Sequence, residues 1–566
     1  MACSPEQLNR DGRVAQAPAT ASVEVVTRGL LGDSRAVALG ILASRITGFG
    51  RIAVAAAVLG PTFFGNLFQT AAVLPSTLYG LLMGTLISAV LVPPLVRSIA
   101  SGDANAPRRF AQAALGVMLL VLASVAALCI VLSPLLLRLI TASVADPGIR
   151  QQQVQLGIPL LIMLMPQIAL YGLAGAGLAA QQAHGRFALS AAAPAVENLI
   201  NIAVLTASAV LFGIGRDVSQ ITVPQLLLLG LGTTAAVAVH AGVQWFGAYR
   251  VGIALMPRFD WGCPEISDLL RRGAAMASYT ALCWCAYLVV LVVAGTVPGG
   301  VAAFQIASSF CALPTVLIAV PLASAQLPRL SRSDDRDDSN AFSIIYQNGL
   351  RLMMFGVVPA ALLIASIPGT LAGAASFGAM GTTQGIALIG ACLGGLGLGI
   401  IGEATYTLTA PSCYAGRDTA SPVKAMGLRL AIVAVGAVMA RLALAPGTGL
   451  LYGLCLSLAA ANLVAGAYLC HKLLRTLRGR VTLYSSGLGS AFLVAVVSVA
   501  PARLLADWLS GEAASIYQRA ALAVAVSGTA MALYLAIQFL RGAQELRLLL
   551  PSRADRWAAR PRRAET

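Results

Sequence analysis

Long apolar blocks separated by short polar connections run along nearly the whole chain. Each block has about 20 residues or more, the length that a helix needs to cross the hydrocarbon core of a bilayer. The pattern predicts fourteen transmembrane helices in an all-α integral membrane protein. The blocks occupy residues 36–60, 66–96, 110–137, 155–180, 187–213, 224–248, 273–297, 300–328, 348–373, 384–412, 425–446, 450–470, 485–506 and 516–540.

One long connection, residues 249–272, divides the chain after six predicted spans, and another runs over 329–347. A proline-flanked pattern recurs on both sides of the division. LPSTL at 74–78 precedes LVPPL at 91–95, and LPTVL at 313–317 precedes QLPRL at 326–330. The repeat indicates two parallel six-helix halves facing a cavity, as in transporters. Chance similarity between two proline-flanked helices is the alternative.

These boundaries predict six segments. We expect a polar N-terminal tail (1–33), a six-helix bundle (34–250), a cytoplasmic linker (251–272), a second six-helix bundle (273–473), two further transmembrane helices (484–540) and a basic tail (541–566).

Composition agrees with a membrane protein, because 58% of residues are hydrophobic and only 11% are charged. Soluble domains carry about 25% charged residues. A soluble fold, a disordered chain and a collagen-like fibre are therefore excluded. The net charge of +16 does not indicate nucleic-acid binding, because the basic residues are scattered between apolar blocks.

The basic residues also predict an orientation, since cytoplasmic connections of membrane proteins collect Lys and Arg. With the N-terminus in the cytoplasm, the cytoplasmic side receives most of them, including Arg417, Lys424 and Arg429. Both termini are then cytoplasmic. The outer side receives only Arg138, Arg150, Arg216, Arg441, Arg503 and Arg519.

Motifs for cofactors or catalysis are weak. The ten cysteines show no metal-ligand spacing, and we expect no metal and no bound cofactor. The G-x-G-x-x-G pattern at 397–402 lies in an apolar span, where glycines favour close helix packing. The acidic cluster around 334–338 fits a solvated loop better than a site for lipid diphosphates.

Two arginines, Arg45 and Arg51, lie within the first predicted span. Charges inside the membrane are costly and indicate function by default. A kink at Gly48 or Gly50 would turn both toward one cavity, where guanidinium groups bind phosphate or pyrophosphate. Alternatively, Arg45 pairs with a carboxylate and Arg51 reaches an interface.

Two intramembrane carboxylates, Glu197 and Glu403, are candidates for pairing with an arginine, binding a cation or carrying a proton. Each is equally well explained as a glutamate satisfied within the bundle. His240, near the middle of the sixth span, is better explained as a hydrogen-bonded packing residue than as a proton relay.

Several segments together resemble the MurJ (MviN) family of lipid II flippases, part of a superfamily with polysaccharide flippases and multidrug exporters. The similar segments follow in order along 35–430, and the family also has fourteen helices. They are SRITGFGRIAVAAAVLG at 44–60, LPSTLYGLLMGTLISAVLVPPL at 74–95, QQAHGRFALSAAAPAVENLINI at 181–202, LPTVLIAVPLASAQLPRLSR at 313–332 and TLTAPSCYAGRDTASPVKAM at 407–426.

The resemblance implies a V-shaped cavity between two bundles, with the two extra helices forming a groove for a lipid tail. It places the family's two first-helix arginines at Arg45 and Arg51. Other cavity positions differ: Asn66 replaces an acid, Tyr79 one of two paired arginines and Ser309 the arginine of the eighth helix. We expect these five residues to contact the substrate.

The expected function is that of a flippase for a lipid-linked cell-wall precursor in the bacterial cell membrane, driven by membrane potential or an ion gradient. A monovalent cation is a candidate coupling ion. The substrate, membrane lipids and cell-wall synthesis proteins are the expected partners. Alternatives are an exporter of another polysaccharide unit or a drug, a membrane enzyme acting on polyprenyl phosphates, and a scaffold without transport.

Overall fold

The computed structural model describes residues 19–86, 92, 95–96, 106–253, 256–258, 264–335, 338–477, 486–509 and 515–549. Every regular element in these ranges is a helix. The predicted polar tail and the first linker lie partly outside the described ranges, as does the basic C-terminal tail. The chain is already helical from Ala19, and the seventh predicted span begins within a helix that starts at Pro264.

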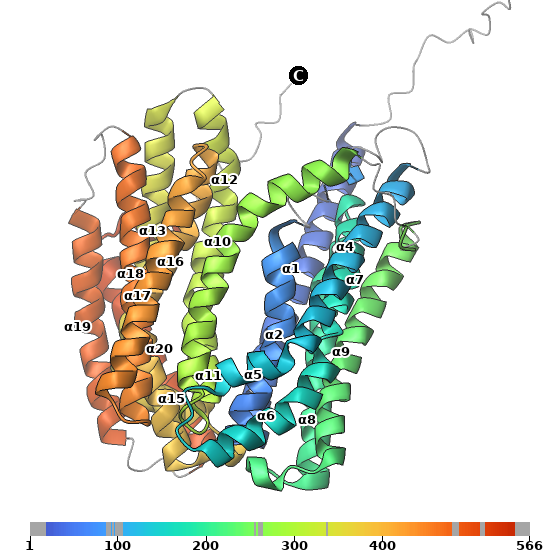
Figure 1. Cartoon of the computed structure of the whole chain (residues 1–566). Coiled ribbons are helices and arrows are strands. Elements are labelled where there is room, and N and C mark those ends of the chain that lie inside the picture. The colour runs from blue at the N-terminus through green and yellow to red at the C-terminus, as the bar shows by residue number, and fades with distance from the viewer. Residues whose placement is uncertain are drawn as a thin grey trace, which may run out of the picture.

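The helices gather in two bundles that diverge toward one end of the molecule (Figure 1). The N-terminal bundle contains α1 (Ala19–Leu59), α2 (Phe63–Leu86), α4 (Ala106–Val131), α5 (Ser133–Thr141), α6 (Pro147–Leu164), α7 (Gln167–Ala183), α8 (Ala188–Phe212), the short η2 (Val218–Gln220) and α9 (Val223–Arg250).

The C-terminal bundle contains α10 (Pro264–Ala294), α11 (Gly300–Pro314), η3 (Thr315–Ala319), α12 (Val320–Asp335), α13 (Ser339–Ser366), α14 (Pro368–Ala375), η4 (Gly378–Gly381), α15 (Thr383–Leu396), α16 (Gly399–Ala415), α17 (Ala420–Ala443) and α18 (Thr448–Thr476). The last helices, α19 (Ser486–Leu509), α20 (Ile516–Leu540) and α21 (Gln544–Leu549), pack against α13 and α14.

Fewer helices have the length and apolar composition of a membrane span than the fourteen that the sequence predicts. Among the described residues, eleven helices are long and apolar enough to span, or twelve if the bent pair α15–α16 is one span. The predicted second and seventh spans correspond to α2 and α10, which are not among them. In α10, the apolar segment among the residues whose side chains are described is Ser278–Ala294. Fourteen spans therefore stay a prediction.

Each bundle has its own apolar core, built largely from Ala, Leu and Val. Small residues allow helices to approach closely where apolar burial cannot drive association in lipid. The glycine pattern at 397–402 illustrates this. A side chain at Gly399 would collide with Ala459, and one at Gly402 with the backbone of Asn462 on α18. These glycines therefore allow close helix packing, as the sequence predicts.

The two bundles meet at the end opposite to their divergence. Asn66 on α2 is almost fully buried there and bonds three backbone groups of the C-terminal bundle. Its amide donates to the carbonyls of Gly295 (3.1 Å) and Val297 (2.7 Å), and its oxygen accepts from the N–H of Val301 (3.1 Å). Because the contact joins different bundles, it holds this end closed.

We expect Asn66→Ala to loosen this closed end. The substitution leaves two carbonyls and one N–H without their partner, at a cost of about 1–3 kcal/mol for a buried group. Hydrogen–deuterium exchange of segment 295–301 should become faster. Asn198→Ala is the matched control, because Asn198 bonds Ser44 and Thr47 within one bundle. Equal exchange of the segment in wild type and Asn66→Ala would contradict a closing role.

Candidate functional site

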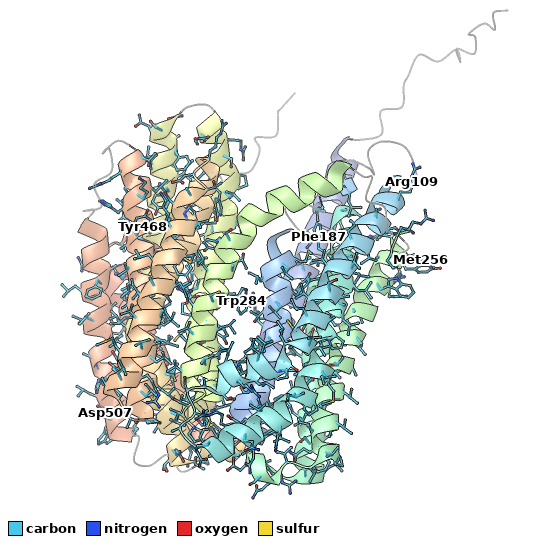
Figure 2. All side chains as sticks on the ribbon, in the orientation of Figure 1. Arg109, Phe187, Met256, Trp284, Tyr468 and Asp507 are labelled. Carbon is cyan, nitrogen blue, oxygen red and sulfur yellow. The ribbon has the colours of Figure 1, made fainter. Side chains whose placement is uncertain are left out.

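A cavity of about 510 Å³ lies between the two bundles. Its wall is made by α1, α2, α7, α8 and α9 on one side and by α10, α11, α16 and α17 on the other. Trp284 projects from α10 toward the N-terminal bundle (Figure 2). The volume falls within the range of about 300–1,000 Å³ that is usual for small-molecule sites.

Several buried polar atoms in this wall have no hydrogen-bond partner among the described residues. They are Nε of Arg51, both amide atoms of Gln69, Nε2 of Gln305 and Oγ of Ser308. Buried polar groups in proteins are nearly always bonded, so such a cluster calls for an explanation. A ligand rich in oxygen atoms would provide the missing partners.

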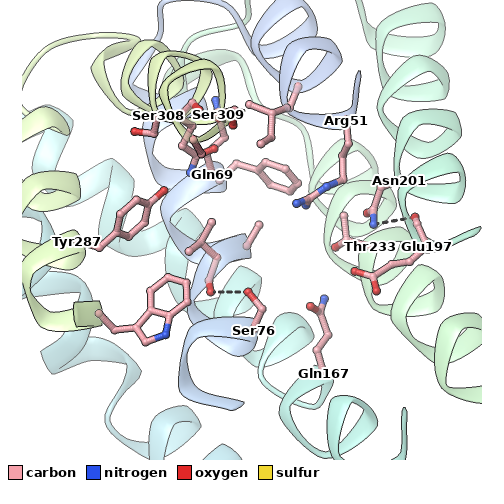
Figure 3. Close-up of a pocket in the computed structure, with 18 of the residues that line it drawn as sticks. Arg51, Gln69, Ser76, Gln167, Glu197, Asn201, Thr233, Tyr287, Ser308 and Ser309 are labelled. Atoms are coloured by element: carbon pink, nitrogen blue, oxygen red, sulfur yellow. Dashed lines mark hydrogen bonds between the residues drawn. The ribbon is translucent and has the colours of Figure 1, made fainter. Parts of the chain in front are cut away.

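Arg51 extends from α1 into the cavity on the same side as Glu197 and Asn201 (Figure 3). The helix α1 is continuous through Gly48 and Gly50. No carboxylate in the described part of the chain forms an ion pair with Arg51. Its positive charge is therefore not neutralised by direct contact.

Glu197, an acid that lines the same cavity, is hydrogen-bonded to other side chains rather than paired with Arg51. Its Oε2 shares a 2.6 Å hydrogen bond with Nδ1 of His240, and its Oε1 accepts a 2.8 Å bond from the hydroxyl of Tyr171. Tyr79 stacks on Tyr171 with ring centres 5.7 Å apart. Three helices thus hold a buried carboxylate at the cavity wall, close enough to Arg51 for electrostatic interaction.

The facing wall carries an arginine that the sequence analysis assigned to a cytoplasmic connection. Arg429 is only 8% exposed and lines the same cavity from α17. That assignment was wrong, because α17 already begins at Ala420. The position of Arg429 within an apolar block could have revealed this, because Arg429 is the fifth residue of the predicted span 425–446.

The start of α17 is set by Asp418, which places Arg429 at cavity depth. The Asp418 carboxylate accepts hydrogen bonds from the N–H groups of Ala420 (3.1 Å) and Ser421 (3.0 Å), as an N-terminal helix cap does. Partial burial acts to raise the pKa of Asp418, but these hydrogen bonds outweigh it and hold the pKa below its usual value.

The other predicted site residues are distributed unevenly. Ser309 lines the cavity and donates a 2.8 Å bond to the carbonyl of Gln305. Arg45 is exposed on α1 and does not line the cavity, while Tyr79 touches it only through Tyr171. Asn66 lies at the closed end. Glu403 lies on α16, one turn before the lining residue Tyr406.

A metal site is not apparent in this part of the molecule. Within the described ranges, no three His, Cys, Asp or Glu side chains come together as ligands. The arrangement instead offers guanidinium, amide and hydroxyl groups to an anionic, hydroxyl-bearing ligand.

Comparison with known proteins identifies relatives along most of the chain. A family model described as "Lipid II flippase MurJ" matches residues 55–524. A probable lipid II flippase MurJ of Rhizobium meliloti is 24% identical over 520 residues, covering 90% of this chain and 93% of that protein. A second one, from Rhizobium tropici, is 24% identical over 396 residues, covering 69% and 72%.

Two solved structures share the fold. A lipid II flippase MurJ in an inward closed conformation gives a TM-score of 0.69 at 15% identity, covering 89% of this chain and 99% of that one. A multidrug resistance MATE family transporter in an inward-facing conformation gives 0.62 at 14% identity, covering 78% and 96%.

Proposed function

This chain belongs to the MurJ family of lipid II flippases, and we propose that it moves a lipid II-like precursor across the membrane for peptidoglycan synthesis. The precursor is an undecaprenyl-pyrophosphate glycan, carried from the inner to the outer leaflet of the bacterial cell membrane. One observation carries the proposal: a cavity between two bundles holds arginine charge that pairs with no carboxylate among the described residues.

The chemistry of the cavity suits such a headgroup. A pyrophosphate must pass through about 30 Å of hydrocarbon, where an isolated charge is strongly disfavoured. Arg51 offers directed donors and a fixed charge to the phosphates. Gln69, Gln305 and Ser309 offer groups to sugar hydroxyls. Arg45, nearer the end at which α1 begins, is the proposed first contact of the entering headgroup.

Transport requires the cavity to open to each side in turn. The bundles diverge toward the end at which α1 begins (Figure 1). Asn66, near the start of α2, bridges them at the other end. The distribution of basic residues makes the diverging end cytoplasmic. The present conformation is then inward-facing, and rocking of the bundles around the bound headgroup would open the outer side.

We assign coupling to the carboxylate Glu197. Its two oxygens are held by His240 and Tyr171, so the charge of Arg51 is left for the anionic substrate. Breaking the contact between Glu197 and His240 would let Glu197 offset Arg51, and the anion would be held less strongly. The charged and titratable groups facing this carboxylate are Arg51 on α1, Tyr79 on α2, Tyr171 on α7 and His240 on α9.

A membrane enzyme acting on polyprenyl phosphates is the alternative from another class. It needs a cluster of Asp, His and Arg side chains at one interface; among the described residues, no three His, Cys, Asp or Glu side chains are placed to hold a metal ion for such chemistry. An exporter of another lipid-linked unit uses the same cavity chemistry. Binding of the purified protein to defined lipid-linked glycans separates these substrates.

We expect Arg51→Ala to abolish flipping of a lipid-linked pyrophosphate in proteoliposomes. Loss of a charge-assisted hydrogen bond costs about 1.5–3 kcal/mol, or roughly 10- to 100-fold in binding. Arg51→Lys should restore part of the binding, because it keeps the charge but not the fork of donors. The matched control is Arg250→Ala, at the cytoplasmic end of α9. Unchanged flipping by Arg51→Ala would refute the assignment.

We expect His240→Ala to weaken substrate binding, because Glu197 loses the partner of its 2.6 Å hydrogen bond and becomes free to offset the charge of Arg51. Affinities of wild type and variant for the same lipid-linked pyrophosphate test this. Equal affinities would show that the Glu197–His240 contact does not control the site.

A further inference from the structure

Arg429 is a buried cation that the proposed function does not use. It projects from α17 into the cavity wall formed by the C-terminal bundle, facing the bundle that carries Arg51. The two arginines therefore belong to the two bodies that must move relative to each other during transport.

Neighbouring groups fix one edge of the Arg429 guanidinium. Its Nε donates a 2.6 Å bond to Oδ1 of Asn462, and Nη1 donates a longer 3.4 Å bond to the carbonyl of Cys283. The guanidinium carbon lies 6.0 Å from the ring centre of Tyr406, a cation–π distance. Nη2 makes no hydrogen bond to a described residue. The side chain is thus held in place with donors left over.

The charge of Arg429 lacks a direct counter-ion in the described structure. Glu403 is near enough to interact electrostatically, but the two side chains form no ion pair. An uncompensated buried charge is strongly destabilising, and within a membrane such a residue marks a ligand path by default. An anion in the cavity would supply the missing partner.

The internal repeat gives Arg429 a counterpart in the other bundle. Tyr171 and Glu403 are each the fifth residue of a 17-residue helix, α7 and α16. A four-residue connection follows each helix, and Glu197 and Arg429 are each the tenth residue of the next helix. Both tenth residues line the cavity. Equivalent positions therefore face the substrate space with opposite charge.

From these observations we infer that Arg429 is the second anion-binding point of the cavity, and that a diphosphate bridges the bundles with one phosphoryl group on Arg51 and the other on Arg429. The inference rests on the proposed function and specifies how its substrate is held. A diphosphate offers one phosphoryl group to each arginine, whereas a monophosphate offers a single group. The site therefore selects diphosphate-linked over monophosphate-linked lipids.

The test uses the purified full chain and two probes, undecaprenyl diphosphate and undecaprenyl monophosphate. We expect wild type to bind the diphosphate at least about tenfold more tightly. Arg429→Gln should lose that preference, and the double variant with Arg51→Gln should bind the diphosphate more weakly than either single variant. Arg441→Gln, near the far end of α17, is the matched control and should behave as wild type.

The possible outcomes separate the bridging inference from the proposed function. If Arg429→Gln keeps the diphosphate preference while Arg51→Gln loses it, the bridging inference fails and the proposed function stands. If wild type binds neither probe, the proposed function itself fails. If Arg429→Gln is unstable, Arg429→Lys serves instead: it keeps the charge but loses the fork, and partial retention of the preference supports the inference. A preference equal to that of wild type in folded Arg429→Lys and Arg429→Gln overturns it.

Discussion

The cavity depends on one constraint: arginine charge is kept inside a membrane-spanning bundle, although no carboxylate in the described part of the chain pairs with it. Two acids, Glu197 and Glu403, lie close enough to interact with Arg51 and Arg429, yet neither forms an ion pair with them. Glu197 is instead bound by Tyr171 and His240. In the proposed function, an anion bound in the cavity would supply the partner that these two buried charges lack.

Packing of small residues supplies the rigidity that such a site needs. Glycines of α16 let α18 approach closely at Asn462, whose side chain in turn accepts a hydrogen bond from Arg429 on α17. At the closed end, Asn66 joins the bundles through three backbone hydrogen bonds. Two stiff bundles with a polar contact at one end can rock as bodies, because each keeps its own apolar core.

The apolar blocks predicted an all-helical membrane protein, and a charge within the first block predicted that Arg51 lies at a cavity. Both predictions were possible because both signals are local in sequence. Arg429 was missed since a basic residue near the start of a span looks like a loop residue until the helix boundary is known. Asn66 and Tyr79 were expected to contact substrate, but their roles depend on partners from distant segments. Such pairings arise only when the helices pack, and no spacing within one helix encodes them.

The most direct measurement is rescue of a bacterium depleted of its lipid II flippase by this chain. The account predicts growth and normal cell shape, because the cavity carries the arginine charge that a pyrophosphate headgroup requires. Absence of rescue by protein that is inserted and folded in the membrane would contradict lipid II as its substrate. Only transport of that precursor restores growth, so neither a drug exporter nor a phosphate-processing enzyme would give the predicted result.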